Sequence, residues 1–427
     1  MNNNININNG NNYNYNKYKE SYQNCVKCGK CLPVCPTYNY SLNEFLSPRG
    51  RVHLISIEKS GAGPLSVSKI DKALSTCLLC GRCSSVCPNE VCTEILVAEE
   101  KAAIRKINNE PLSVSNLVLK ILKSKKRLLL QTGLRLSGIL KFKNRFVPQP
   151  EYFPFITHKD LKFPSKTEYI KVGYFTGCAF NAVYPKISED TAFALNKNGG
   201  SVYVPSSQLC CGLPHISSGD IASFKELAIN NALAFKELNL DTIVTSCASC
   251  SYSISKLYPL YFNESDKNYR DVIDFAGKLK DIWTFLNLLK KRGGEIKKGE
   301  LKNKLNAVFH IPCHLETPDD FLPSTINENL IGEAGSIFDK IDALELKPLK
   351  HNYCCGNGGM FNIRHYNISK EITKKKFEEI KEASPQIILT SCSGCMFSLQ
   401  DQSGIIKNDK KLPVKHLIEI YAESLKE

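Results

Sequence analysis

Long hydrophobic runs are missing from this sequence, and their absence limits the kinds of protein it can encode. No stretch of the 427-residue chain approaches 18 uninterrupted apolar residues, so we expect no conventional transmembrane helix. The N-terminus is polar, with ten asparagines in residues 1–16, and it does not have the composition of a secretory signal peptide. We interpret residues 1–20 as a disordered, asparagine-rich tail and expect a cytoplasmic protein.

Recognisable nucleotide-binding and hydrolytic motifs are also missing. The chain has no phosphate-binding loop, no H-E-x-x-H zinc motif and no cue for a Ser-His-Asp triad. The glycines of "GAGPLS" at residues 61–66 do not form a dinucleotide fingerprint, because Pro64 follows them and no helical pattern opens there. We therefore expect neither an NAD nor an FAD site, and no catalysis by this chain alone.

One segment lacks acidic residues altogether. Residues 112–150 contain no Asp or Glu but many Lys and Arg, in a chain whose formal net charge is +14. On a helical wheel most basic residues lie opposite an apolar arc formed by Leu117, Val118, Ile121, Leu122, Leu128 and Leu129. Such a helix can lie at a lipid interface, in peripheral contact with the inner face of the cell membrane, or it can pack on the rest of the protein. A nucleic-acid role is not expected, because no aromatic residues interleave the charges.

Cysteine, by contrast, is abundant. The chain has 19 cysteines, an odd number, and most of them lie in tight clusters. In a chain without an export signal, clustered cysteines are typical of metal sites rather than of disulfides. Nine of them lie within residues 21–100, and two adjacent pairs, Cys210–Cys211 and Cys354–Cys355, are each followed by a glycine.

Two runs of four cysteines have the spacing C-x2-C-x2-C-x3-C-P, which is typical of proteins that bind two [4Fe–4S] cubane clusters. The second run repeats the first at an offset of 52 residues. Three closely spaced thiolates can bind one cubane, while the fourth cysteine of the run reaches the other cluster. We therefore expect one cluster on Cys25, Cys28, Cys31 and Cys87, and the other on Cys77, Cys80, Cys83 and Cys35. A pair of zinc sites is the alternative, although zinc motifs usually supply two separated pairs of ligands.

From about residue 169 onward, short apolar runs alternate with helical patterns. We expect strands over residues 169–178, 201–205 and 241–247, and helices over 188–200 and 223–239. Alternation of this kind predicts an α/β fold with a mainly parallel sheet. The second half of this region repeats the first, at offsets of 135 residues from Cys178 and 145 residues from Cys250, which predicts a loop insertion in the second copy.

Each copy carries five cysteines near the ends of predicted strands. Ligand sites in such sheets gather at the carboxyl ends of the strands. Five thiolates are more than one zinc ion or one ordinary cubane requires, whereas an adjacent pair fits a larger cluster in which one thiolate bridges or caps. The glycine that follows each pair lets the backbone fold closely around such a group. The first set is Cys178, Cys210, Cys211, Cys247 and Cys250, and the second is Cys313, Cys354, Cys355, Cys392 and Cys395.

The spacing C-x31-CC-G-x34-C-x2-C of the first set resembles the cysteine-rich CCG domain of heterodisulfide reductases. Two such domains behind a double ferredoxin resemble the iron–sulfur subunits of glycolate oxidase, of lactate-oxidising complexes and of anaerobic glycerol-3-phosphate dehydrogenase. The resemblance implies an α+β multidomain chain: a helical two-cluster ferredoxin domain (21–111), the basic amphipathic linker (112–150) and two repeated α/β CCG domains (151–275 and 276–427). Besides the two cubanes, it implies one or two non-cubane four-iron clusters on the five-cysteine sets.

On this resemblance we expect an electron-transfer subunit. A partner flavoprotein containing FAD would oxidise a 2-hydroxy acid, glycolate or lactate, and this chain would pass the electrons to a quinone or another carrier. Two alternatives stay open: a heterodisulfide reductase-like catalytic subunit that cleaves disulfides at its non-cubane clusters, and a structural zinc site in one or both halves.

Other residues with metal-binding side chains lie near the cysteines. Four histidines are expected to be hydrogen-bonded neighbours of the sites or core residues, and His314, directly after Cys313, is the best candidate to tune a cluster. The four are His215, His310, His314 and His351. Cys92 lies outside both four-cysteine runs, and we expect a buried free thiol there.

Overall fold

The structure, a computed structural model, describes most of the chain. The described residues are 18–61, 66–107, 114–124, 151, 153–166, 169–291, 295–315, 337–403 and 411–426. Nearly all of the asparagine-rich tail, most of the basic linker, and much of the segment expected to hold the loop insertion lie outside the described residues, at 1–17, 125–150 and 316–336.

The N-terminal part is a small helical unit built around the two four-cysteine runs. Pro36, directly after Cys35, opens α2, and Pro48 opens α3, where the Ser47 side chain accepts from the backbone N–H of Gly50. Proline suits a first helical turn because its missing N–H would have no partner within the helix. The helices are α2 (Pro36–Ser41), α3 (Pro48–Ser60), α4 (Val67–Ser75), α5 (Arg82–Ser85) and α6 (Thr93–Ile107), with 3-10 turns η1 (Ser21–Asn24) and η2 (Glu44–Leu46).

The first α/β repeat forms a five-stranded sheet in the order β1-β3-β2-β4-β5. Only the short edge strand β1 runs antiparallel to its neighbour. The strands are β1 (Leu161–Phe163), β2 (Ile170–Tyr174), β3 (Gly200–Val204), β4 (Thr242–Thr245) and β5 (Leu279–Asp281). Around them lie α9 (Gly177–Ala182), α10 (Pro185–Lys197), α11 (Leu213–Ser217), α12 (Ile221–Lys236), α13 (Ala248–Tyr252), the π-helical turn η3 (Ser253–Leu257), α14 (Tyr258–Tyr261), α15 (Tyr269–Lys278) and α16 (Ile282–Lys291).

The second repeat has a four-stranded, fully parallel sheet in the order β7-β6-β8-β9. Its elements are β6 (Gly299–Phe309), β7 (Ile341–Leu346), α18 (Phe361–Arg364), α19 (Tyr366–Ala383), β8 (Ile387–Thr390), α20 (Ser393–Ser403), β9 (Val414–His416) and α21 (Leu417–Ser424). Both repeats therefore arrange their four parallel strands in the same order, as the duplication predicts. In such sheets the strand order reverses between the first and third strands, which is where ligands bind.

The α+β architecture and the predicted elements of the first repeat are confirmed, with small differences at the helix ends. Helix α10 starts three residues earlier than the predicted 188, because Pro185 occupies its first turn. Helix α12 starts two residues earlier than the predicted 223, and the Asp220 side chain caps it by accepting from the Ser223 backbone N–H.

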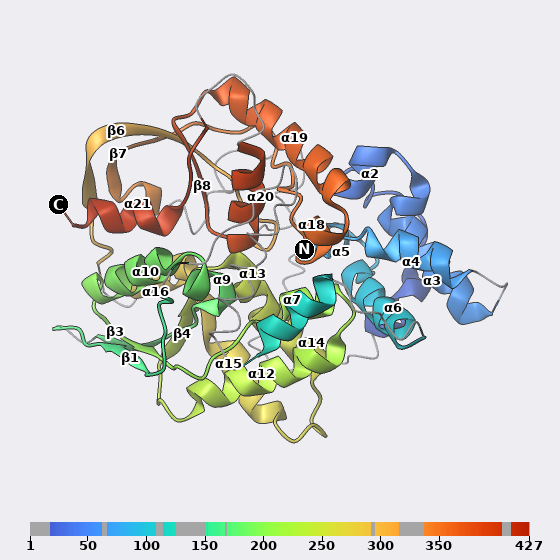
Figure 1. The fold of residues 1–427 in the computed structure, drawn as a ribbon, viewed down its shortest axis with the longest axis horizontal. Helices are drawn as coiled ribbons and strands as arrows, with labels where there is room; N and C mark the ends of the chain where they lie inside the picture. Colours follow the sequence, from blue (N-terminus) through green and yellow to red (C-terminus); the bar gives the residue numbers. More distant parts are fainter. Residues whose placement is uncertain are drawn as a thin grey trace.

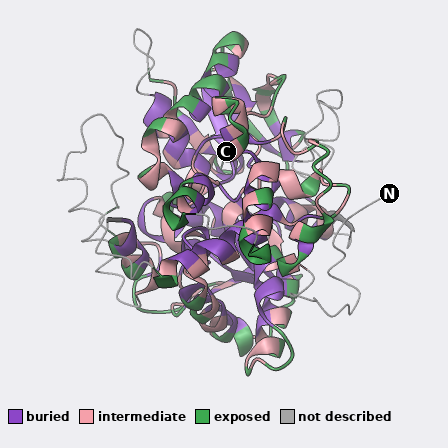
Figure 2. Cartoon of the chain, turned by 90° about the vertical axis from the view of Figure 1, so that its right-hand side faces the viewer, coloured by how far each residue is buried: buried purple, intermediate pink, exposed green. Residues whose placement is uncertain are grey.

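The N-terminal helical unit, η1 to α6, is called the ferredoxin part below. It packs with the two repeats into one body, and a continuous hydrophobic core runs from it into both repeats. Figure 1 shows the ferredoxin helices on one side, against both repeats, with α13 and α20 near the middle of the molecule. Polar contacts tie the parts together: Lys375 donates to the Asn39 carbonyl at 2.8 Å, and Arg82 donates to the Asn352 carbonyl at 2.9 Å. Buried residues fill the interior of the whole body in Figure 2.

Helix α7 (Val114–Lys123) is the described part of the basic linker, and it packs on the first repeat. Leu119 is buried and its carbonyl accepts from His215 Nε2 at 3.0 Å, while Lys123 forms an ion pair with Glu226 of α12. Leu117, which we expected on the apolar arc, is instead 56% exposed, because the helix turns Leu119 toward the core. These contacts favour the packing interpretation for residues 114–124.

Among the described residues, no helix is long and apolar enough to cross a membrane.

Candidate metal centres

The two four-cysteine runs fold in the same way, as their 52-residue offset predicts. Lys27 and Leu79 have positive φ angles of 57° and 53°, and Gly29 and Gly81 have φ angles of 86° and 75°. Left-handed residues placed this way turn backbone N–H groups toward one side and form an anion-binding nest, a feature of many iron–sulfur sites. Glycine adopts this conformation without strain, whereas no sequence pattern predicts it for a lysine or a leucine.

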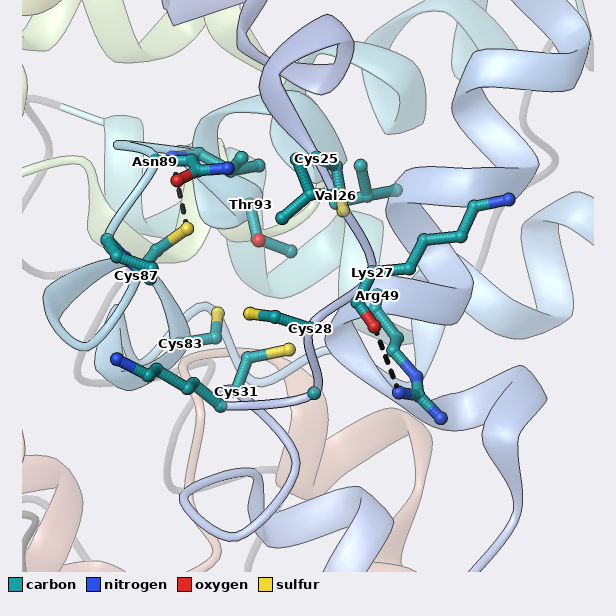
Figure 3. Close-up of a pocket in the computed structure, with 15 residues that line it drawn as sticks. Cys25, Val26, Lys27, Cys28, Cys31, Arg49, Cys83, Cys87, Asn89 and Thr93 are labelled. Atoms are coloured by element: carbon teal, nitrogen blue, oxygen red, sulfur yellow. Dashed lines mark hydrogen bonds between the residues drawn. The ribbon is translucent and has the colours of Figure 1, made fainter.

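The first cavity gathers cysteines from both runs (Figure 3). It encloses about 420 Å³, including space open to solvent, and is lined by Cys25, Cys28, Cys31, Cys83 and Cys87. Four of these are the set expected for the first cubane. The backbone N–H of Val91 donates to Cys87 Sγ at 3.4 Å.

The second cavity lies deeper and gathers the other expected set. It encloses about 350 Å³ and is lined by Cys35, Cys77, Cys80 and Cys83. Cys83 therefore lines both cavities. Burial raises the pKa of Cys80 to about 12, and that of Cys31 in the first cavity to about 11. These thiols stay protonated near neutral pH unless a metal displaces the proton, because a coordinating thiol loses it outright.

A buried positive charge beside the second cavity fits an anionic group there. Arg51 is 1% exposed, and its guanidinium donates to the carbonyls of Ala73 and Thr76 at 2.8 and 3.1 Å. Its Nη1 lies 4.0 Å from Cys35 Sγ. No carboxylate among the described residues forms an ion pair with it, although burying an unpaired cation is costly. A cluster held by four thiolates would supply the missing negative charge, so the donor set and its surroundings fit an iron–sulfur cluster.

The first five-cysteine set forms a row of contacting thiols at the strand ends of the first repeat. Cys178 follows β2, the adjacent pair follows β3, and the last two cysteines follow β4. The order of contact is Cys178, Cys210, Cys211, Cys250 and Cys247. Gly212 has a φ of +83°, and a Cβ there would lie 2.6 Å from Phe224, so the glycine after the pair is required for close packing.

The second five-cysteine set is arranged like the first around β6, β7 and β8. Its row of contacting thiols is Cys354, Cys355, Cys395 and Cys392. Cys313 is half-buried and lies close enough to Cys354 to raise the pKa of that thiol. His310 also joins this set, because its Nε2 lies 3.3 Å from Cys395 Sγ.

Hydrogen bonding within the rows distinguishes thiolates from thiols. Bonds from Cys210 and Cys250 hold the pKa of Cys211 well below its usual value. Cys355 is its counterpart in the second repeat, where bonds from Cys354 and Cys395 and the neighbouring His310 lower its pKa in the same way. A site that stabilises thiolates in a buried position is prepared for a metal, since the thiolate is the form that binds.

The two rows meet at the centre of the molecule, which the sequence did not predict. The thiols of Cys247 and Cys392, which are 145 residues apart, contact each other. Cys247 Sγ lies 3.3 Å from Ser393 Oγ, and Cys392 Sγ lies 3.1 Å from Ser249 Oγ. The ten cysteines of the repeats are therefore adjacent sets rather than two distant sites.

An aromatic pair links this junction to the second cavity. The rings of Tyr252 and His314 stack with centroids 4.4 Å apart and an interplanar angle of 5°. His314 Nδ1 lies 3.2 Å from Ser249 Oγ at the junction, and the Tyr252 hydroxyl donates to Glu94 at 3.5 Å. A Cβ on Gly81, between Cys80 and Cys83, would lie 3.3 Å from that hydroxyl. His314 of the second repeat therefore contacts Ser249 and Tyr252 of the first repeat, and Tyr252 in turn contacts Glu94 of the ferredoxin part.

The remaining residues near the cysteines have simpler roles. His215 is a buried core histidine, as expected. The His351 side chain is 52% exposed and lies 3.6 Å from Glu379, so it is not a core residue. Cys92 is partly exposed rather than buried, and its Sγ lies 3.7 Å from the Glu90 carbonyl.

Comparison with known proteins assigns the same parts. A 4Fe–4S dicluster domain matches residues 21–91, and the cysteine-rich CCG domain matches residues 172–255 and 307–400. The chain is an iron–sulfur protein with one dicluster domain and two CCG domains.

Named relatives are similar over most of this length. The chain is 27% identical to a probable glycolate oxidase iron–sulfur subunit of Bacillus subtilis, covering 94% of this chain and 93% of the relative. It is 25% identical to a fumarate reductase (CoM/CoB) subunit of Methanothermobacter marburgensis, covering 90% and 69%. It is 26% identical to lactate utilization protein A 1 of Bacillus mycoides, covering 60% of this chain and 99% of the relative.

Proposed function

We propose that this chain is the iron–sulfur electron-transfer subunit of a flavin-linked 2-hydroxy acid dehydrogenase. A partner flavoprotein with FAD oxidises glycolate or lactate, and electrons leave this chain to a quinone or another carrier. Similarity to the probable glycolate oxidase iron–sulfur subunit across nearly the whole chain supports this assignment. The observation that carries it is the continuous series of cysteine sites, from a surface cavity to the buried row at the centre.

The residues divide into four candidate cluster sites. The first cavity would hold a cubane on Cys25, Cys28, Cys31 and Cys87, and the second on Cys35, Cys77, Cys80 and Cys83. The two five-cysteine sets would hold the non-cubane clusters. Iron–sulfur clusters accept and release one electron at a time, with potentials set by burial, charge and hydrogen bonds to sulfur.

The protein controls solvent access along this series. Cys28 at the first cavity is exposed, whereas eight of the ten cysteines in the two repeats are buried. A shallow site is suited to exchange electrons with a partner, and buried sites keep water away from the thiolates. The hydrogen bond from the Tyr252 hydroxyl to Glu94 joins the first repeat to the ferredoxin part. The buried Arg51 guanidinium holds the backbone together beside the second cavity.

The proposal is tested by mixing the anaerobically purified chain with its flavoprotein partner. Glycolate, D-lactate or L-lactate should bleach the iron–sulfur absorbance only when the flavoprotein is present, because removal of a hydride needs a two-electron acceptor. Oxidation of one of these acids by the flavin-free chain with an artificial dye would contradict the proposal.

A second function is favoured by one observation. Both five-cysteine sets are complete and touch at Cys247 and Cys392, and one relative is named as part of a fumarate reductase (CoM/CoB). A heterodisulfide reductase-like subunit, which cleaves a disulfide at such sites, also requires complete five-cysteine sets. Reduction of a disulfide by the chain, when it is supplied with electrons, would support this function over the first.

Contact with the membrane surface is a separate part of the proposal, because a quinone lies in the membrane. Helix α7 packs on the first repeat, so the remaining basic residues of the linker are the candidates for contact with anionic lipid. Each basic residue near an anionic surface contributes about 1 kcal/mol. Charge reversal at Lys125, Lys126 and Arg127 should reduce co-sedimentation with anionic vesicles.

A further inference from the structure

The two five-cysteine sets differ at one buried position next to the sulfur atoms. Phe175 follows β2 in the first repeat, and His310 follows β6 in the second, 135 residues later. The two residues are structurally equivalent. The Phe175 backbone N–H donates to the Val244 carbonyl at 2.8 Å, and the His310 N–H donates to the Leu389 carbonyl at the same distance.

The surroundings of these two side chains are different. Phe175 is fully buried and packs against Phe235 and Phe275, with ring centroids 6.3 Å away in both cases. His310 is 1% exposed and faces the cysteines of its own repeat. Its nearest ligand atom and the Sγ atoms of Cys355 and Cys395 all lie within 4.8 Å of one another.

Only one nitrogen of the His310 ring is engaged. Nε2 lies 3.3 Å from Cys395 Sγ, whereas buried Nδ1 has no hydrogen-bond partner within the described part of the chain. Burying an imidazole is costly unless its polar atoms are paired, so contact with sulfur is what offsets the burial of this ring. Thiolate sulfurs accept hydrogen bonds, and Nε2–H is the donor that the geometry offers.

We propose that His310 donates a hydrogen bond to the thiolate sulfur of Cys395, beside Cys355, and so makes the second five-cysteine site the more easily reduced of the two. The inference rests on the proposed function to the extent that this set must hold an iron–sulfur cluster. An added electron increases the negative charge on the sulfurs, and a donor directed at them stabilises the reduced form more than the oxidised form. The first site has no such donor at this position, because Phe175 occupies it.

A donor role explains the arrangement better than a ligand role. The first repeat has five cysteines and no histidine at this position, and the second repeat has the same five cysteines at equivalent positions. His310 therefore adds to a set that is already complete. Groups that contact metal ligands commonly tune a site in this way without binding the metal.

The test compares three variants of the whole chain, purified anaerobically with their clusters. His310→Phe copies the first repeat, Phe175→His copies the second, and His310→Gln keeps an N–H donor near the Nε2 position. Redox titration followed by electron paramagnetic resonance measures the midpoint of each site. In His310→Phe the midpoint of one non-cubane signal should move to lower potential. At a fixed potential, the ratio of reduced to oxidised site should fall about tenfold. For a one-electron couple this corresponds to a midpoint shift of about 59 mV.

The other variants give the matched results. Phe175→His should raise the midpoint of the other non-cubane signal, and His310→Gln should retain most of the wild-type midpoint. The ferredoxin signals and the iron and sulfide content should not change. If the midpoint of fully loaded His310→Phe stays at the wild-type value, His310 has only a packing role and the inference is wrong.

Two further outcomes separate this inference from the proposed function. If His310→Phe and His310→Gln both lose the iron of one site, and pulsed resonance shows a strongly coupled nitrogen in the wild type, His310 is a ligand and not a donor. If the wild-type repeats contain zinc and no acid-labile sulfide, the proposed function fails together with the inference.

Discussion

The buried positive charge of Arg51 gives the most direct test of whether the second cavity holds a negatively charged cluster. Arg51→Met keeps most of the apolar stem and removes the guanidinium. The Ala73 carbonyl keeps a hydrogen bond from the Thr76 hydroxyl at 2.8 Å, whereas the Thr76 carbonyl loses its guanidinium donor at 3.1 Å. The bond from Nη2 to the Thr37 hydroxyl at 3.1 Å is lost as well.

The size of the effect follows from these contacts. A buried carbonyl left unpaired costs about 1–3 kcal/mol, and a hydrogen bond to a charged donor contributes about 1.5–3 kcal/mol. Because the lost bonds are not additive, we expect a destabilisation of about 3 kcal/mol for the protein with its clusters. Urea slopes of about 1–3 kcal/mol/M convert this into a midpoint about 1–3 M lower.

Anaerobic urea titration of the iron–sulfur absorbance measures the change. Arg49→Met is the matched control on the same helix, because Arg49 is partly exposed and pairs with Glu44 at the surface, and it should shift the midpoint much less. The counter-charge argument also requires a larger effect with the clusters than without them. Equal shifts for Arg51→Met in the loaded and the metal-free protein would refute it, and the role of Arg51 would then be limited to its hydrogen bonds.

Two further predictions concern the metal content and the cysteine rows. Four clusters correspond to about 16 iron atoms per chain with an equal amount of acid-labile sulfide, and a zinc-rich protein almost free of sulfide would contradict the assignment. Cys211→Ser and Cys355→Ser should each abolish one non-cubane resonance signal and leave the ferredoxin signals intact. A smaller change in the other non-cubane signal is expected, because Cys247 and Cys392 connect the rows. Loss of every signal would show instead that these cysteines hold the fold together.

Local features were well determined by the amino-acid sequence. The spacing of the four-cysteine runs, the glycine after each adjacent pair and the strand–helix alternation all depend on neighbours along the chain. They predicted the α+β architecture, the duplication and the strands β2, β3 and β4. The matching φ angles of Gly29 and Gly81, 86° and 75°, agree with the offset of 52 residues between the two runs.

Helix ends and helix faces were predicted less well. The apolar arc assigned to the basic linker included Leu117, which is exposed, and did not include Leu119, which is buried. A helical wheel gives the spread of apolar residues, but the partner surface decides which of them it covers. Here that surface contains His215 and Glu226 of the first repeat.

Contacts between distant residues were decided only by the tertiary structure. Cys247 meets Cys392, and Tyr252 stacks on His314, because two similar sheets and the ferredoxin part pack against one another. No local pattern encodes the relative placement of segments more than a hundred residues apart. The same reason applies to the hydrogen bond of His310 and the positive charge of Arg51. Both depend on sulfur atoms that lie beside these residues only in the packed structure.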